Sequence, residues 1–181
     1  MFVWKEKNGI KFLELNAFKK TEARAIFTSR KSGVSTGDYT SLNLGFHTGD
    51  RHDNVLKNRE LVASVAGINY EDFVAAEQTH GNRVYVVQKS DKGRGAIDHF
   101  ISIPETDALI TAGKKIPLIS FYADCVPLYF LDPAKKVVGL AHAGWRGTMK
   151  KIARETILAM KKSFKCNIND ILVAIGPSIS G

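Results

Sequence analysis

Apolar residues are concentrated in three consecutive runs in the second half of the chain, and polar residues lie at the ends of these runs. The runs are Pro117–Ala123, Val126–Leu131 and Val137–Ala141. Each has the length of a buried strand and is rich in β-branched or aromatic residues. Because rigid strands hold the groups at their ends in place, the polar residues there are the first candidates for chemistry.

The same pattern predicts further strands on both sides of this region. They are expected at Lys11–Phe18, Arg24–Ser29, Phe73–His80, Arg83–Gln88, Asp107–Thr111 and Ile171–Ile175. The third and fourth flank the turn Thr79–Asn82, so they are expected to form a hairpin-like pair. The last is expected to be a buried strand.

Two helices are expected from apolar residues that recur at three- and four-residue steps. The first is Arg51–Ala66, with Gly67 as its stop. The stem of Arg59 on that helix is expected to cover the core. The second is Thr148–Phe164, whose apolar stripe is expected to pack on the core. That stripe consists of Met149, Ile152, Ala153, Thr156, Met160 and Phe164.

Two stretches between these elements have the composition of loops. Lys31–Asp50 is dense in Gly, Ser, Thr, Asn and Asp, and loops of this length usually have a function. Its glycines could let backbone N–H groups bind an anion, and a plain surface excursion is the alternative. Lys89–His99 is charged and contains glycine, so it is expected to be exposed and mobile.

Composition and charge narrow the class of protein. The chain has 181 residues, is 44% hydrophobic and 24% charged, and carries a net charge of +8. These values are typical of one globular domain, and no apolar run has the length of a membrane span. The lysine pairs, Lys19–Lys20 among them, are scattered, which disfavours a nucleic-acid groove, although a positive field would steer anions. Two distant cysteines and the lack of an evident signal peptide favour the cytoplasm.

A histidine, a cysteine and a second histidine occupy comparable positions at strand ends. They are His80, Cys125 and His142. Two imidazoles and one thiolate suit zinc, and three protein ligands leave a fourth position open, as in catalytic sites. Each residue also has a plainer interpretation, because a lone cysteine is often a small buried apolar residue and loop histidines are often only hydrogen-bonded.

Six short motifs resemble those of the YfiH/LACC1 family, also called the polyphenol oxidase or multicopper polyphenol oxidoreductase laccase family. They appear in family order across nearly the whole chain. The motifs are Ser41–Gly45 with Thr48–Asp50, Gln78–Gly81, Thr106–Leu109, Ala123–Pro127, His142–Thr148 and Ile175–Ile179.

The resemblance implies a fold, a cofactor and an activity. The fold would be α/β (α+β), with a mixed β-sheet core flanked by helices. The cofactor would be one zinc ion held by His80, Cys125 and His142. The activity would be phosphorolysis of adenosine, inosine, guanosine and methylthioadenosine, with deamination of adenosine. Family members usually continue beyond the last motif, so residues 1–181 are expected to form a single domain that is incomplete at its C-terminus.

Roles for further residues follow from the proposed chemistry. In deamination, a carboxylate would move protons, as in zinc nucleobase deaminases, and Asp124 is the first candidate and Glu77 the second. In phosphorolysis, Arg146 at a helix start and Arg30 in the long loop would hold phosphate. Asn43, His47 and Gln78 complete the expected substrate-binding set.

Three other functions stay open at this stage. One is a copper-dependent phenol oxidase. Five histidines, two cysteines and three methionines are too few for a multicopper site, but His₂Cys can hold one copper. Another is a metal-free hydrolase of a small amide, such as a peptidoglycan precursor, with Cys125 as nucleophile and His142 as base. The third is a zinc-stabilised interaction module without turnover.

Overall fold

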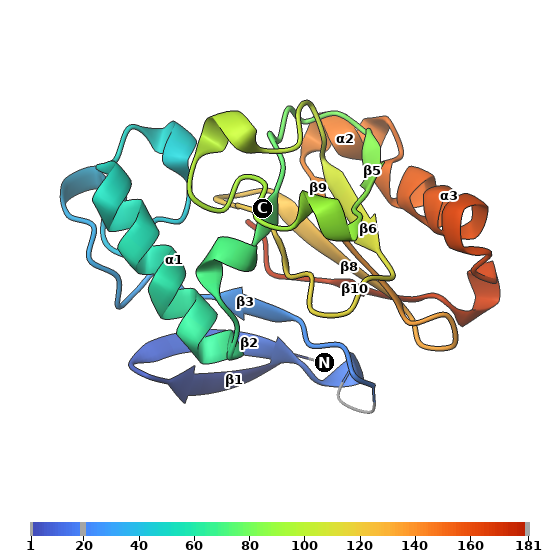
Figure 1. Ribbon diagram of the computed structural model, residues 1–181, viewed down its shortest axis with the longest axis horizontal. Coiled ribbons are helices and arrows are strands. Elements are labelled where there is room, and N and C mark those ends of the chain that lie inside the picture. Colours follow the sequence, from blue (N-terminus) through green and yellow to red (C-terminus); the bar gives the residue numbers. More distant parts are fainter. Residues whose placement is uncertain (1, 19–20, 180–181) are drawn as a thin grey trace.

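The computed structural model describes residues 2–18 and 21–179, and the Lys19–Lys20 pair lies outside them. Its centre is a mixed sheet of five strands (Figure 1). In spatial order these strands are β10 (Leu172–Ile175), β8 (Val126–Asp132), β9 (Val137–Ala143), β6 (Ala108–Thr111) and β5 (Val84–Val86). Only β5 and β6 pair in parallel within this sheet, and the other pairs are antiparallel. The predicted α+β class with a mixed sheet is therefore confirmed.

Two smaller sheets complete the β structure. The first is antiparallel and contains β1 (Phe2–Lys7), β2 (Ile10–Leu15) and β3 (Ile26–Thr28). The second pairs β4 (Val74–Ala75) with β7 (Leu118–Ile119) in parallel.

The helices are α1 (His52–Ala66), α2 (Trp145–Met149) and α3 (Ile152–Phe164). Short 3-10 helices lie at Asn16–Phe18, Gly37–Tyr39, Phe46–Thr48, Tyr70–Asp72, Lys89–Asp91, His99–Ile101 and Ile168–Asp170. In Figure 1, α3 lies on one side of the central sheet, and α1 and the N-terminal sheet lie on the other.

Alternation along β8 and β9 explains how the central sheet buries both faces. Leu128 and Phe130 pack with Ile152 and Met160 on the α3 side. Tyr129 and other residues of the intervening positions pack against the N-terminal segment on the opposite side. Successive side chains of a strand point to opposite faces, so His142 lies on the face away from α3.

The expected hairpin at Phe73–Gln88 is wrong. Strand β4 pairs with β7, whereas β5 pairs with β6 in a different sheet. The two apolar runs are adjacent in sequence, but each finds its hydrogen-bonding partner elsewhere. The segment between them is therefore free to form a turn that is not constrained by a strand ladder.

The expected single helix at Thr148–Phe164 is also divided. Helix α2 ends at Met149, and Lys151 adopts the left-handed conformation with φ of 63° before α3 begins. The side-chain amide of Asn82 donates to the Lys150 carbonyl at this break. Met149, expected in the core stripe, is therefore 76% exposed, while Ile152 and Met160 are buried.

Three other expectations need correction. Only Leu118–Ile119 of the run Pro117–Ala123 forms a strand. Strand β10 is an exposed edge strand, not a buried one, because its outer edge has no neighbouring strand among the described residues. The segment Lys89–His99 is not uniformly exposed: Asp91 and Ala96 are buried.

The buried part of this last segment is held by Arg59 of α1. The Arg59 guanidinium donates to the carbonyl oxygens of Gly95 and Ala96 at 2.5 and 2.8 Å, and to that of Leu44 at 2.9 Å. It also lies 4.1 Å from the ring centroid of Phe46. Arg59 is only 1% exposed, so both its stem and its charged group belong to the core.

Candidate metal centre

His80, Cys125 and His142 come together in space although they are far apart in sequence. One potential ligand atom from each lies within 4.8 Å of the others. The two imidazole rings are 4.8 Å apart between centroids and inclined at 78°. His142 is 4% exposed, whereas His80 and Cys125 are half-buried. Such an arrangement brings three donors to one point and leaves one side open.

Strand register accounts for two of the three positions. Val126 pairs with Ala143 and Pro127 pairs with His142. Cys125 immediately precedes Val126, so it falls at the end of β8 beside the last residues of β9. His80 reaches the same place from the turn after β4, where its φ is 60°.

Gly144 leaves room for this convergence. A Cβ atom at Gly144 would lie 2.8 Å from His80 Cδ2, 3.2 Å from Cys125 Sγ and 3.7 Å from His142 Cε1. A side chain at this position would therefore clash with His80 and crowd Cys125, while it would meet His142 at an ordinary contact distance. The missing Cβ and the N₂S donor set both fit a small tetrahedral cation such as zinc, with a fourth position left for a non-protein ligand.

Asp107, directly before β6, contacts both histidine-bearing segments. Its carboxylate accepts hydrogen bonds from His142 Nδ1 at 2.8 Å and from the backbone N–H groups of His80 and Gly81 at 3.0 and 2.7 Å. Burial alone raises the pKa of Asp107, but the hydrogen bonds from His142, Gly81 and Thr79 outweigh burial and lower that pKa below its ordinary value. Asp107 is therefore ionised and accepts hydrogen bonds only. It is absent from the site set predicted above, although it lies within one of the family motifs.

The electrostatic setting of Cys125 disfavours a free thiolate. Burial, and then the negative charges of Asp124 and Asp107, raise the pKa of the Cys125 thiol. Binding of a cation would reverse this preference, because a coordinating thiol gives up its proton.

The three residues open onto an extended cavity of about 2070 Å³. Six other predicted site residues also line this cavity: Arg30, Asn43, His47, Glu77, Gln78 and Asp124. Arg146 is not among the lining residues, and its guanidinium carbon lies 4.7 Å from the ring centroid of Trp145. The structure thus groups nine of the ten predicted residues around one cavity.

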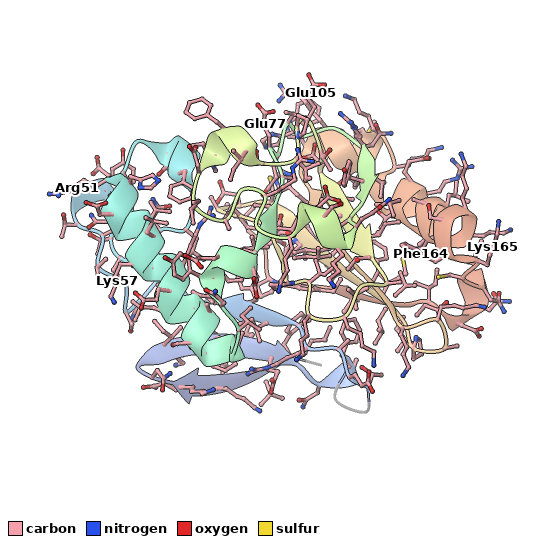
Figure 2. The ribbon with its side chains drawn as sticks, in the orientation of Figure 1. Arg51, Lys57, Glu77, Glu105, Phe164 and Lys165 are labelled. Carbon is pink, nitrogen blue, oxygen red and sulfur yellow. The ribbon has the colours of Figure 1, made fainter. Side chains whose placement is uncertain are left out.

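The two candidate carboxylates differ in their surroundings. Asp124 is exposed next to Cys125. Glu77 is half-buried, and its Oε2 accepts a hydrogen bond from the Glu105 N–H at 3.3 Å. Figure 2 shows Glu77 and Glu105 together at the same edge of the molecule.

The side-chain amides of Gln78 and Asn43 are occupied by intramolecular hydrogen bonds. Gln78 Nε2 donates to the Phe121 carbonyl, and Gln78 Oε1 accepts from the Phe121 N–H and the Ser120 hydroxyl. Asn43 Nδ2 donates to Thr48 Oγ1 and Asp50 Oδ2. Both amides hold the backbone around the cavity, so any contact with substrate would need to share these groups.

Aromatic residues next to His47 were not singled out by the sequence. The His47 ring lies 5.8 Å from that of His99 and 6.2 Å from that of Phe121 between centroids. Partial burial, and then the charges of His99 and Arg59, lower the pKa of His47. Its ring is therefore biased toward the neutral form at this wall of the cavity.

Two further findings bear on the class of protein. Among residues 2–18 and 21–179, the group His80, Cys125 and His142 is the one cluster of three or more potential metal ligands. None of the helices in the same residues combines the length and apolar character of a membrane span.

The chain has relatives of known name. It is 44% identical to "Purine nucleoside phosphorylase YlmD" of Bacillus subtilis, over 88% of this chain and 58% of that protein. It is 34% identical to "Purine nucleoside phosphorylase LACC1" of Homo sapiens, over 84% of this chain and 34% of that protein. The chain therefore spans a little more than half the length of YlmD.

Solved structures of YlmD and YfiH are also similar to this chain. YlmD of Geobacillus stearothermophilus superimposes with a TM-score of 0.93 at 37% identity, over 99% of this chain and 66% of that one. The Bacillus licheniformis protein YfiH gives a TM-score of 0.90 at 34% identity, over 96% and 66% of the two chains. The model of the family described as multi-copper polyphenol oxidoreductase laccase matches residues 24–181. The chain therefore belongs to this family, which we infer from the match over most of its length.

Proposed function

We propose that the protein is a zinc-dependent purine nucleoside phosphorylase that also deaminates adenosine. The observation that carries this proposal is the convergence of His80, Cys125 and His142 on one point of a large cavity. The names of the relatives, purine nucleoside phosphorylase, support the choice of substrate class. The substrates would be adenosine, inosine, guanosine and methylthioadenosine, together with phosphate.

Zinc suits the donor set better than the other common divalent cations. Thiolate and imidazole together favour zinc, whereas magnesium and calcium take oxygen ligands. When bound with one open position, zinc acts as a Lewis acid and makes a bound water more acidic. The roles of the protein residues follow from where they lie around that position.

Asp124 is the first candidate for proton transfer. It lines the cavity directly before Cys125, and it is exposed. In deamination its carboxylate would accept a proton from the attacking water and pass it to the leaving amino group. Glu77 is the second candidate, and its hydrogen bond from the Glu105 N–H holds its carboxylate in place.

Arg30 is the first candidate for binding phosphate. Its side chain is exposed at the cavity wall, where a guanidinium can make two parallel hydrogen bonds to phosphate. In phosphorolysis a phosphate oxygen bonds to the ribose C1′ as the bond from C1′ to the base nitrogen breaks, which yields the free base and ribose 1-phosphate. Arg146 faces Trp145 outside the cavity lining, so it is the weaker candidate for this role.

Product analysis by chromatography tests the proposal. Adenosine is incubated with the zinc-loaded chain, with and without phosphate, and with a strong chelator as a control. We expect adenine only when phosphate is present, inosine with or without phosphate, and neither after chelation. YlmD of Bacillus subtilis serves as the assay control, because it is longer and is named for this activity. Turnover by YlmD with none by this chain would overturn the proposal for this chain.

Copper-dependent phenol oxidation is the second candidate, and the description of the matching family favours it. The His₂Cys group can hold a single copper ion. The described residues offer no second cluster of three ligands, which a multicopper centre would need. Oxygen uptake with a phenol by the copper-loaded chain, at a rate above that of free copper, would favour this candidate over the nucleoside reaction.

Metal-free hydrolysis by Cys125 and His142 has weaker support. The raised pKa of Cys125 leaves its thiol protonated near neutral pH, whereas a nucleophilic cysteine needs its thiolate. Rapid alkylation of Cys125 by iodoacetamide at pH 7 in the chelator-treated protein would contradict this argument.

A further inference from the structure

We propose that Asp107 is the positioning residue of the metal centre, because one buried carboxylate holds both histidine ligands in the orientation that binds the ion. This inference rests on the proposed metal-dependent function. It concerns a residue that is not itself a ligand, and it predicts a loss of metal affinity that a general loss of stability would not produce.

The carboxylate of Asp107 is enclosed and fully used. Its side chain is inaccessible to solvent. Oδ1 accepts from His142 Nδ1 at 2.8 Å and from the His80 N–H at 3.0 Å. Oδ2 accepts from the Gly81 N–H at 2.7 Å and from the N–H and hydroxyl of Thr79, both at 3.3 Å. A single buried acceptor group therefore serves five donors from two segments.

The contact with His142 selects the nitrogen that can bind metal. The N–H groups of Thr79, His80 and Gly81 can only donate, so the Asp107 carboxylate acts as an acceptor, and a proton on His142 Nδ1 completes the same pattern. The lone pair then lies on Nε2, which becomes the ligand atom. A carboxylate partner of this kind fixes the tautomer and orientation of a ligating histidine and increases its basicity.

The contact with His80 acts through the backbone. His80 has a φ of 60°, in the left-handed region that few non-glycine residues adopt. The N–H groups of Thr79, His80 and Gly81 all point at the Asp107 carboxylate. Since β4 and β5 do not form a hairpin, no strand ladder holds this turn, and the carboxylate takes over that role.

The two contacts share one atom. Oδ1 of Asp107 joins the ring of His142 and the backbone of His80, so the relative position of the two ligands depends on a single oxygen. The ring centroids of these histidines are only 4.8 Å apart, a separation that needs support from outside the pair. Removing the negative charge or the second oxygen should therefore loosen both ligands at once.

The test compares Asp107→Asn with Asp132→Asn. Asp132 is the matched control, because it is also a buried aspartate. It is the last residue of β8, at the opposite end of that strand from Cys125. Zinc affinity is measured by competition with a chromogenic chelator, and the stability of each metal-free variant is measured by thermal unfolding. We expect Asp107→Asn to weaken zinc binding by about 10- to 100-fold, and Asp132→Asn to leave it unchanged whatever its effect on stability.

A second readout reports on geometry. Cobalt replaces zinc, and the visible spectrum of cobalt with a thiolate ligand shows whether the site is tetrahedral. We expect the wild-type chain and Asp132→Asn to share one spectrum and Asp107→Asn to differ. If Asp107→Asn does not fold, Asp107→Ser, which keeps one acceptor oxygen, replaces it. Failure of both variants to fold even with zinc would make Asp107 a folding residue and overturn the inference.

The outcomes separate this inference from the proposed function. If the wild-type chain does not bind zinc or cobalt through Cys125, the metal centre and the proposed function fail together. If the wild-type chain binds zinc and Asp107→Asn binds it equally well with the same cobalt spectrum, only the role of Asp107 is lost.

Discussion

Two polar clusters of the molecule use their hydrogen-bonding groups in opposite ways. The first organises the long loop 31–50 around Asn58 of α1. Asn58 accepts from the Val34 N–H at 2.8 Å and donates to Ser35 Oγ at 2.9 Å and to the Asn43 carbonyl at 2.8 Å. Ser35 and Asn43 in turn donate to Asp50. The polar groups of this cluster therefore form hydrogen bonds with one another.

The second cluster, His80, Cys125 and His142, is supported only from outside. Asp107 accepts hydrogen bonds from His142 Nδ1 and from the His80 N–H, and within residues 2–18 and 21–179 no hydrogen bond joins His80, Cys125 and His142 to one another. Two imidazoles and a thiol that converge at one cavity without bonding to one another can together bind a cation. A cluster whose polar groups pair with one another stabilises the fold, whereas a cluster that is held only by a neighbouring residue keeps its converging atoms free to bind a ligand.

Two glycines of the loop 31–50 use their backbone N–H groups in hydrogen bonds within the loop. The Gly45 N–H donates to Asn43 Oδ1, and the Gly33 N–H donates to Ser41 Oγ. The N–H groups of Gly33 and Gly45 are therefore used within the loop and are not available to an anion, which was one of the two interpretations of this segment.

The largest effect should follow from His142→Ala. Loss of a ligand should weaken zinc binding by more than the loss of its hydrogen-bonding partner, so by more than about 100-fold. Zinc retained after dialysis, measured by elemental analysis, checks this expectation. Equal zinc retention by the variant and the wild-type chain would remove His142 from the metal centre.

Asn58→Ala tests the first cluster, which should contribute to stability and not to metal binding. It leaves several buried partners unpaired, so the free energy of unfolding should fall by about 3 kcal/mol, as measured by urea denaturation. The zinc affinity of the folded protein should stay unchanged. Asn54→Ala is the matched control, because Asn54 makes one longer hydrogen bond, of 3.3 Å, to Asp50. Similar losses for both variants would contradict the central role of Asn58.

Gly144→Ala should perturb the metal centre by crowding. Overpacking of this kind costs about 1–3 kcal/mol, and here the cost should appear as weaker zinc binding. Because the added methyl group would lie 2.8 Å from His80 Cδ2 and 3.2 Å from Cys125 Sγ, both side chains must shift, and part of the same cost should appear as a lower unfolding temperature of the metal-free protein. Undiminished zinc affinity would show that the ligands can move away from Gly144.

The smallest effect on the fold is expected for His47→Ala. Stability should change by no more than about 0.5 kcal/mol, because the ring lies at the cavity surface, and zinc affinity should not change. If His47 contacts the nucleoside, KM for adenosine should rise. His52→Ala is the control, because His52 binds the Ile97 carbonyl and is not among the cavity-lining residues. A rise in KM for His52→Ala alone would exclude the role of His47.

The sequence predicted that His80, Cys125 and His142 would lie close together, because strand ends can be recognised from apolar runs. Cys125 directly precedes β8 and His142 lies near the end of β9, and the register of these strands brings them together. Asp107 was not recognised as part of the site, because its role depends on two long-range features that no local pattern records. One is the backbone hydrogen bond from the His142 N–H to the Asp107 carbonyl, and the other is that β4 and β5 pair with different strands.

The errors in the fold have similar causes. Lysines are good helix formers, so Lys150 and Lys151 gave no sign of the break between α2 and α3. The composition of Lys89–His99 is that of a surface loop, but Arg59 binds its carbonyl groups and holds part of it in the core. In both cases a long-range contact overrides a local preference.

The left-handed backbone at His80 has a consequence for mutagenesis at this position. Histidine already bears the roughly 1–2 kcal/mol cost of this backbone, and alanine at the same position would lose the imidazole and keep that cost. Glycine and asparagine accept this backbone more readily. His80→Asn and His80→Gly would therefore relieve part of this cost while they remove the imidazole, so they would understate the contribution of the ring to folding, and His80→Ala is the cleaner variant.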